Sequence, residues 1–184
     1  MRCSFSLVAL VFSLTVSACL VAADEQPQAA KPGPEHAELM KLAGTWDASM
    51  KMAEVPEAMP AVATYKADCD GMWLASDFKM DTPNFKFQGR GLDGYDQNKK
   101  KYVGIWVDSM SSAPMLMEGT HDTATNTTTM TGTGPSPTGQ PQKFKTVTKM
   151  KDEDHMTFEM FMVGDDGKET SAFTIDYTRR KAGK

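Results

Sequence analysis

Cysteine is scarce in this sequence, with three residues among 184. Cys3 and Cys19 lie in the apolar N-terminal segment, so Cys69 is the one thiol in the rest of the chain. A disulfide framework needs pairs of cysteines, so this count excludes the small disulfide-stapled class of exported domains. The domain must therefore be stabilised by packing, which suits a closed sheet better than a loop-rich fold.

The sequence also lacks a net positive charge and a long apolar run. The formal net charge is −4, and it becomes −5 without residues 1–23, which contain Arg2 and no acidic residue. A mildly acidic surface of mixed sign argues against nucleic acid and against an anionic membrane surface as partners. The apolar stretch at residues 5–16 is too short to span a membrane as a helix.

The first 23 residues have the organisation of an export signal. Arg2 provides a positive start, residues 5–16 are apolar, and small residues follow, which predicts cleavage after Ala23. A second interpretation stays open, because residues 16–19 (Val-Ser-Ala-Cys) resemble a bacterial lipobox in which Cys19 would carry lipid. Both interpretations predict an exported protein, periplasmic or secreted, whose membrane contact is limited to a lipid anchor.

The rest of the chain has room for one domain with a sizeable core. Residues 24–34 are rich in Pro, Ala and polar side chains and predict a disordered tether. Residues 35–42 predict a short helix that stops at Gly44. The domain is therefore expected to span residues 35–184.

After Gly44 the apolar residues recur with period two, which is typical of strands. Short polar breaks, such as Asp70-Gly71 and residues 96–99, leave no room for crossover helices, so the sheet is predicted to be antiparallel. Residues 132–141 form the one long connection. An all-β fold follows: a single up-and-down barrel of about ten strands with a short N-terminal helix. The expected strands are 45–52, 61–68, 72–80, 85–93, 101–108, 114–121, 127–132, 143–151, 155–163 and 170–180.

The strand at residues 101–108 is apolar on both of its faces. One face belongs to the barrel interior, as alternation requires. The outer face is expected to be covered, either by the N-terminal helix or by a partner subunit.

Motifs along the chain carry a family resemblance. Gly44-Thr45-Trp46, with Arg179 or Arg180 at the end of the last strand, resembles the calycins, a superfamily that includes lipocalins, fatty-acid-binding proteins and nitrobindin. More specifically, the chain is similar to the bacterial domain-of-unknown-function family 1579. The resemblance implies a lipocalin-like barrel in which Trp46 packs at the closed end under Arg179, and it implies no activity or ligand. The matching stretches are residues 42–46, 94–96, 101–109, 118–122, 138–139, 158–160, 166–169 and 177–180.

Methionine is unusually frequent, with 15 residues, and three Met-x-Met pairs each lie on one face of a strand. Methionine is a common core filler, because its flexible thioether fits irregular spaces. The alternative is an adaptable apolar cavity for a small ligand. The predicted lining residues are Met50, Met52, Met115, Met117, Phe158, Met160 and Met162.

The sequence contains few motifs that would indicate metal binding, heme binding or catalysis. His36, His121 and His155 are too scattered for a zinc motif, and His36 and His155 are expected at the surface. His121 is the one candidate ligand for heme. Together with Met115 and Met117 it is also the candidate site for Cu(I). The favoured role of His121 is a structural hydrogen bond beside Asp122. The sequence contains no nucleophile elbow, phosphate loop or paired-cysteine motif, so we expect no enzyme, no catalytic residue and no cofactor.

Two functions of different classes remain open. The first is non-catalytic binding of a small apolar ligand inside a methionine-rich barrel. The second is a structural or interaction module with a filled barrel, which forms a homodimer through the outer face of the strand at residues 101–108. In both, Trp46 and Arg179 close one end of the barrel.

Overall fold

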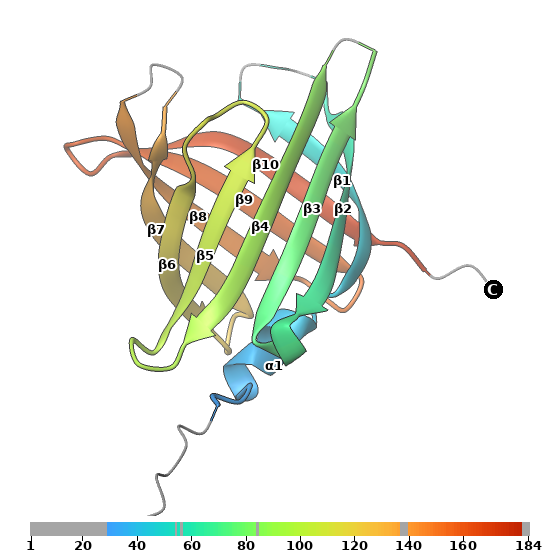
Figure 1. The fold of residues 1–184 in the computed structure, drawn as a ribbon. Coiled ribbons are helices and arrows are strands. Elements are labelled where there is room, and N and C mark those ends of the chain that lie inside the picture. Colours follow the sequence, from blue (N-terminus) through green and yellow to red (C-terminus); the bar gives the residue numbers. More distant parts are fainter. Residues whose placement is uncertain (1–28, 54, 56, 84, 137–139, 182–184) are drawn as a thin grey trace, which may run out of the picture. The chain divides into compact units, whose positions relative to one another are not determined.

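Ten strands and one helix make up most of the described chain (Figure 1). The structure is a computed structural model that describes residues 29–53, 55, 57–83, 85–136 and 140–181. The predicted signal segment, with Cys19, and residues 24–28 of the tether lie outside these residues. The chain divides into residues 1–30 and 31–184, and only the second unit is considered below. Its elements are α1 (Pro34–Met40), β1 (Gly44–Met52), β2 (Met59–Asp68), the 3-10 turn η1 (Cys69–Gly71), β3 (Trp73–Asp81), β4 (Lys86–Asp96), β5 (Lys101–Asp108), β6 (Met115–Asp122), β7 (Thr127–Pro135), β8 (Pro141–Met150), β9 (His155–Val163) and β10 (Glu169–Arg179).

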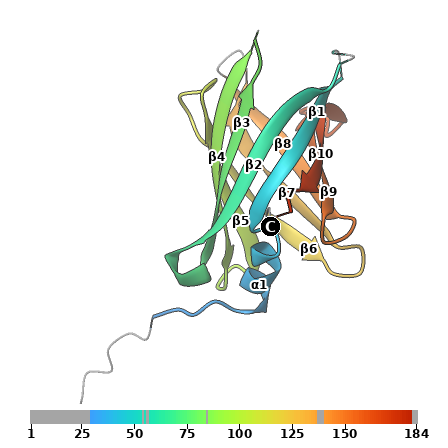
Figure 2. The same cartoon turned by 90° about the vertical axis from the view of Figure 1, so that its right-hand side faces the viewer.

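The strands form a closed antiparallel barrel in which each strand pairs with its neighbours in the chain. β1 closes the ring by pairing with both β2 and β10. Helix α1 lies at one end of the barrel, next to η1 and to β3 and β4 (Figure 2). The predicted all-β up-and-down barrel with a short N-terminal helix is confirmed, and every expected strand boundary lies within three residues of the observed one. Within the described ranges, no helix is both long and apolar enough to cross a membrane.

The barrel is closed near α1 by Trp46 and Arg179. Trp46 is fully buried, and the Cζ atom of Arg179 lies 4.0 Å from its ring centroid, a cation–π contact. The indole Nε1 donates to the carbonyl of Leu42 at 2.9 Å. The guanidinium also donates to three backbone carbonyls, those of Ala43 at 2.5 Å, Lys41 at 2.7 Å and Glu153 at 2.8 Å. One side chain of the last strand therefore holds the first strand, the segment after α1 and the β8–β9 turn together.

The core continues from Trp46 into the barrel and outward to α1. Beside Trp46 the buried members are Ala48, Ala61, Ala63, Phe78, Met80, Met156, Ile175 and Tyr177. A second cluster joins the helix to the barrel through Leu39, Leu74 and Tyr102.

His36 belongs to the same end of the molecule, and its expected place at the surface is wrong. Only 1% of its surface is exposed, and its ring meets Tyr95 edge-on at a centroid distance of 5.9 Å. The cause is local, because the backbone N–H of Gly33 donates to His36 Nδ1 at 2.9 Å, which turns the ring back toward the barrel. His155 is exposed, as expected, and pairs with Asp152 at 2.8 Å.

Two further details differ from the sequence-based expectations. The connection expected at residues 132–141 is largely strand, since β7 continues to Pro135 and β8 begins at Pro141, with Gly132 in register with Phe144. The outer face of β5 is not covered by the helix: Ile105 and Val107 remain 38% and 47% exposed.

Replacing Arg179 by Met should lower the free energy of unfolding by about 2–4 kcal/mol, because the cation–π contact and three charge-assisted hydrogen bonds are lost. Arg180→Met is the matched control, since the neighbouring Arg180 makes only an exposed ion pair with Asp47 and should change stability little. Urea denaturation of both variants measures the difference. Equal losses would show that Arg179 contributes no more than a surface ion pair.

Candidate functional site

The interior of the barrel, called the lumen below, is packed unevenly. About half of the inward-facing side chains of β1, β2 and β10 are buried, whereas every inward-facing side chain of β6 and β7 keeps part of its accessible surface. The half-buried inward-facing side chains of these two strands are Met115, Met117, His121, Thr128 and Met130. His121 and Thr128 line the small space under α1, and Met115, Met117 and Met130 face the lumen. None of the inward-facing side chains of β6 and β7 is fully buried, so the interior is packed least tightly along these two strands.

All seven predicted lining residues face the lumen by alternation and register. They are Met50, Met52, Met115, Met117, Phe158, Met160 and Met162. Only 7% of the surface of Met160 is exposed. Met52 and Met162 lie toward the barrel end away from α1 and are 42% and 39% exposed. The other four are half-buried. The thioethers thus extend from the deep interior to the end away from α1.

Glycines on β4 and β5 make room for large inward-facing groups. A Cβ added at Gly89 would lie 2.0 Å from Cζ2 of Trp106, so the indole ring lies directly over Gly89. A Cβ added at Gly104 would lie 2.5 Å from Asp93 Oδ1 and 3.5 Å from Met130 Cε. The carboxyl of Asp93 and the thioether of Met130 therefore meet over Gly104.

Asp93 is an inward-facing carboxylic acid without a partner. It lies on β4 in register with Leu74 of β3 and Gly104 of β5. Among the described residues no N–H or O–H donates a hydrogen bond to its carboxyl and no cation pairs with it, although the residue is only half-buried. Burial raises the pKa of Asp93 to about 7, because its charged form loses hydration and gains no compensating contact.

Two tyrosines lie deep in the same interior. Burial raises the pKa of both Tyr65 and Tyr177, and the negative charge of Asp93 contributes to the shift at Tyr65. The two hydroxyls also interact with each other. Asp108, the inward-facing carboxylate farther along β5, differs from Asp93, since it accepts hydrogen bonds from Trp106 Nε1 at 3.0 Å and from the backbone N–H of Met110 at 2.8 Å.

His121 has a structural contact. Its Nδ1 lies 2.9 Å from Thr128 Oγ1, and its ring meets Tyr102 at a centroid distance of 6.1 Å. Beside it, the space under α1 has a volume of about 30 Å³, enough for about one water molecule. No group of three His, Cys, Asp or Glu side chains within the described ranges is placed to hold a metal ion.

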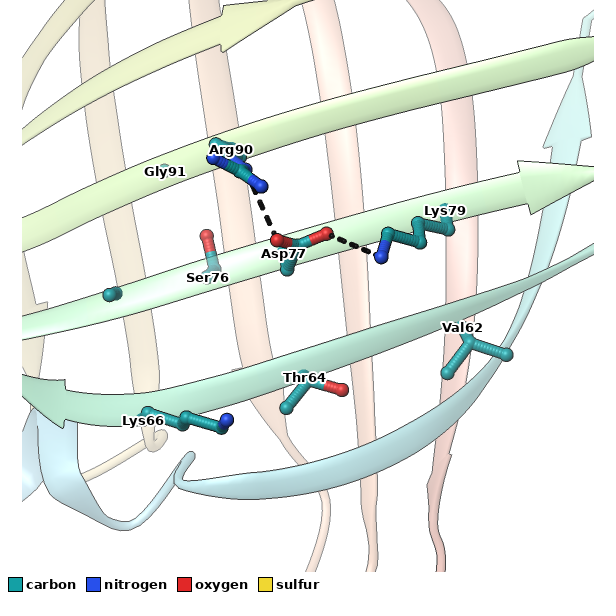
Figure 3. Close-up of a pocket in the computed structure, with 9 residues that line it drawn as sticks. Val62, Thr64, Lys66, Ser76, Asp77, Lys79, Arg90 and Gly91 are labelled. Carbon is teal, nitrogen blue, oxygen red and sulfur yellow. Dashed lines mark hydrogen bonds and ion pairs between the residues drawn. The ribbon is translucent and has the colours of Figure 1, made fainter.

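A second hollow lies outside the barrel, over β2, β3 and β4 (Figure 3). It is open, with a volume of about 450 Å³, and its lining includes Asp77 and the cations Lys66, Lys79 and Arg90. Arg90 Nε lies 3.2 Å and Lys79 Nζ 3.5 Å from the Asp77 carboxylate. Exposed charges of this kind bind weakly because water and salt screen them. The lumen is therefore the stronger candidate site.

The family model described as "Protein of unknown function (DUF1579)" matches residues 31–179. The chain belongs to this family. The family recognised from the sequence motifs is thereby confirmed. No curated protein matches this DUF1579 chain.

Two solved structures are similar to the DUF1579 chain in fold. Rv2717c from M. tuberculosis has a TM-score of 0.59 at 10% identity, over 82% of this chain and 100% of its own. The S-type phycobiliprotein lyase CPES from Guillardia theta has a TM-score of 0.55 at 10% identity, over 83% of this chain and 100% of its own. At 10% identity these likenesses show a shared barrel fold and nothing further.

Sequence reasoning missed Asp93 and Met130 as interior residues. The expected fourth strand ended at residue 93, which placed Asp93 beside a turn, but β4 continues to Asp96. The period-two pattern through Phe87, Gly89 and Gly91 also assigns Asp93 to the inward face, so the signal was present.

Asp93→Asn should stabilise the protein at pH 8 and have little effect near pH 4. The folded-state pKa of Asp93 is raised to about 7, so the penalty for ionising it is absent below about pH 4, grows between about pH 4 and pH 7, and is constant at higher pH. The shift corresponds to at most about 4 kcal/mol. Urea denaturation of both proteins between pH 4 and pH 8 measures the difference.

Glu118→Gln provides a control of opposite sign. Hydrogen bonds from Lys101 and Lys99 lower the pKa of Glu118, so its contribution is present above the pKa of the unfolded chain and is lost as the pH falls. This variant should therefore lose stability at pH 8. A pH-independent effect of Asp93→Asn would contradict the assignment of a buried, unpartnered carboxyl.

Proposed function

We propose that this protein is an exported, non-catalytic barrel that binds a small apolar ligand in its methionine-rich lumen. The observation that carries the proposal is the uneven packing of the interior. None of the inward-facing side chains of β6 and β7 is fully buried, although they lie on the inner side of the sheet. A barrel with a fully packed interior would bury them, as Trp46, Ala48, Ala61 and Ala63 of β1 and β2 are buried.

The chemistry of the lining supports an apolar ligand. Met115, Met117 and Met130 present flexible thioethers beside the ring of Trp106. Sulfur and aromatic carbon bind apolar groups by dispersion and by release of water, and methionine adapts to several ligand shapes. The lining residues of the proposal are the seven predicted ones together with Trp106 and Met130.

The comparisons are compatible with this function at the level of the fold. One similar barrel, of 10% identity, is named as a phycobiliprotein lyase. At this identity the likeness concerns the barrel alone, and the chain's own sequence supplies no catalytic motif. Binding without catalysis is therefore the function proposed here.

Export is supported by the composition of residues 1–23. Native mass spectrometry of protein purified from its own host tests export and ligand together. The mass of the chain distinguishes cleavage after Ala23 from lipidation at Cys19, and an unprocessed chain would contradict export. Any retained small molecule appears as an additional mass.

Wild-type protein should bind Nile red, a neutral apolar dye, with a dissociation constant on the order of micromolar. Met117→Trp should weaken binding about tenfold or more, because the larger side chain occupies the space along β6. Fluorescence titration measures both. Thr120→Trp places the same ring on the outer face of the same strand and should leave binding unchanged. Wild-type protein that binds no apolar dye would refute the proposal.

A second candidate function is a homodimer through the outer face of β5. Leu92, Ile105 and Leu116 lie in one register row across β4, β5 and β6, and Val107 is next to them. Ile105, Val107 and Leu116 are 38%, 47% and 58% exposed. A contiguous apolar face of this kind is typical of a surface that a second copy covers.

Leu116→Glu should convert such a dimer to a monomer, because a charge would be buried in the interface. Sedimentation velocity measures the change. Thr178→Glu, an exposed position on β10, is the control and should leave the dimer intact. A monomeric wild-type protein at concentrations of about 100 μM would exclude a dimer of useful affinity.

A further inference from the structure

Asp93 is the group in the lumen that the apolar-ligand proposal leaves unexplained. Its carboxyl lies over Gly104, beside the Met130 thioether, and has no hydrogen-bond or ion-pair partner among the described residues. A buried polar group without a partner costs free energy, and a protein fold usually supplies a partner for it. Here no described residue supplies a partner, and Asp93, on the inward face of β4, is only half-buried.

The surroundings of Asp93 argue against a structural contact, a metal ion and an anionic ligand as the partner of its carboxyl. The carboxyl makes no contact that would give it a structural role, in contrast to Asp108 with its two hydrogen bonds. A metal ion would need further ligands, and the described residues place no group of three metal-binding side chains together. An anionic ligand would be repelled by the carboxylate. A neutral hydrogen-bond donor and a cation remain as partners, and the cation forms the stronger hydrogen bond with a carboxylate.

The neighbouring side chains narrow the chemistry of that ligand. Inward-facing aromatic rings of β2, β5 and β10 are contributed by Tyr65, Trp106 and Tyr177. Ring faces attract ammonium groups, and a cation paired with a carboxylate in a poorly hydrated site forms strong hydrogen bonds. Beyond Asp93, the thioethers of β6 and β7 favour an apolar chain or ring.

We propose that the lumen binds an amphipathic amine, whose ammonium group pairs with Asp93 and whose apolar body lies along Met115, Met117 and Met130. This inference rests on the proposed lumen function and names the class of ligand. Gly104 is a positioning residue, because only a residue without Cβ leaves room for the Asp93 carboxyl at this place.

Three probes of equal chain length test the inference: decylamine, decanol and decanoate, each used to displace Nile red at pH 8. The wild-type protein should bind decylamine about tenfold or more tighter than decanol, and decanoate weakest. Asp93→Asn should bind decylamine and decanol with similar affinity while still binding Nile red, which shows that the variant is folded. Asp108→Asn, the control at the other inward-facing carboxylate, should keep the preference for decylamine.

The outcomes separate this inference from the proposed function. Equal affinity of the wild-type protein for decylamine and decanol would overturn the amine inference and leave the apolar lumen intact. The same preference in Asp93→Asn would also overturn it. Failure of Nile red and all three decyl probes to bind would overturn the proposed function and the inference together.

Discussion

The contact between Arg179 and Trp46 is the constraint on which the barrel depends. The guanidinium covers the indole ring and donates to three backbone carbonyls from two separate segments. These carbonyls belong to irregular backbone that has no strand partner, so a charged donor satisfies groups that would otherwise stay unpaired. The pairing of β1 with β10 closes the ring, and this one side chain covers the buried ring of Trp46 and ties the segment after α1 to the end of the barrel.

Closure at one end allows the rest of the interior to be packed loosely. The clusters around Trp46 and Leu74 supply a dense core next to α1, where small residues such as Ala61 and Ala63 let the large rings fit. Along β6 and β7 no such core is needed for stability. The methionines there are free to line a space, and Asp93 can stay unpaired at a cost that the dense end offsets.

Much of the fold was predictable from the sequence, because period-two alternation and short polar turns specify an antiparallel meander directly. The inward faces of β1, β8 and β9 also follow from alternation. His36 was not predictable, since its burial depends on a hydrogen bond to Gly33 and on the ring of Tyr95, which lies far away in the chain. Asp93 was missed because a charged residue next to a glycine resembles a turn, and only the register with Gly104 shows the space that it occupies.

The closing pair also has a consequence for how the chain folds. Arg179 reaches Ala43 and Lys41, which precede it by 136 and 138 residues. A nascent chain that has not yet released β10 can form hairpins but cannot close the ring, because both the last strand and its guanidinium are missing. Contacts between such distant segments form late and slowly. We therefore expect the ring to close only after β10 has left the ribosome, as the last step in forming the barrel.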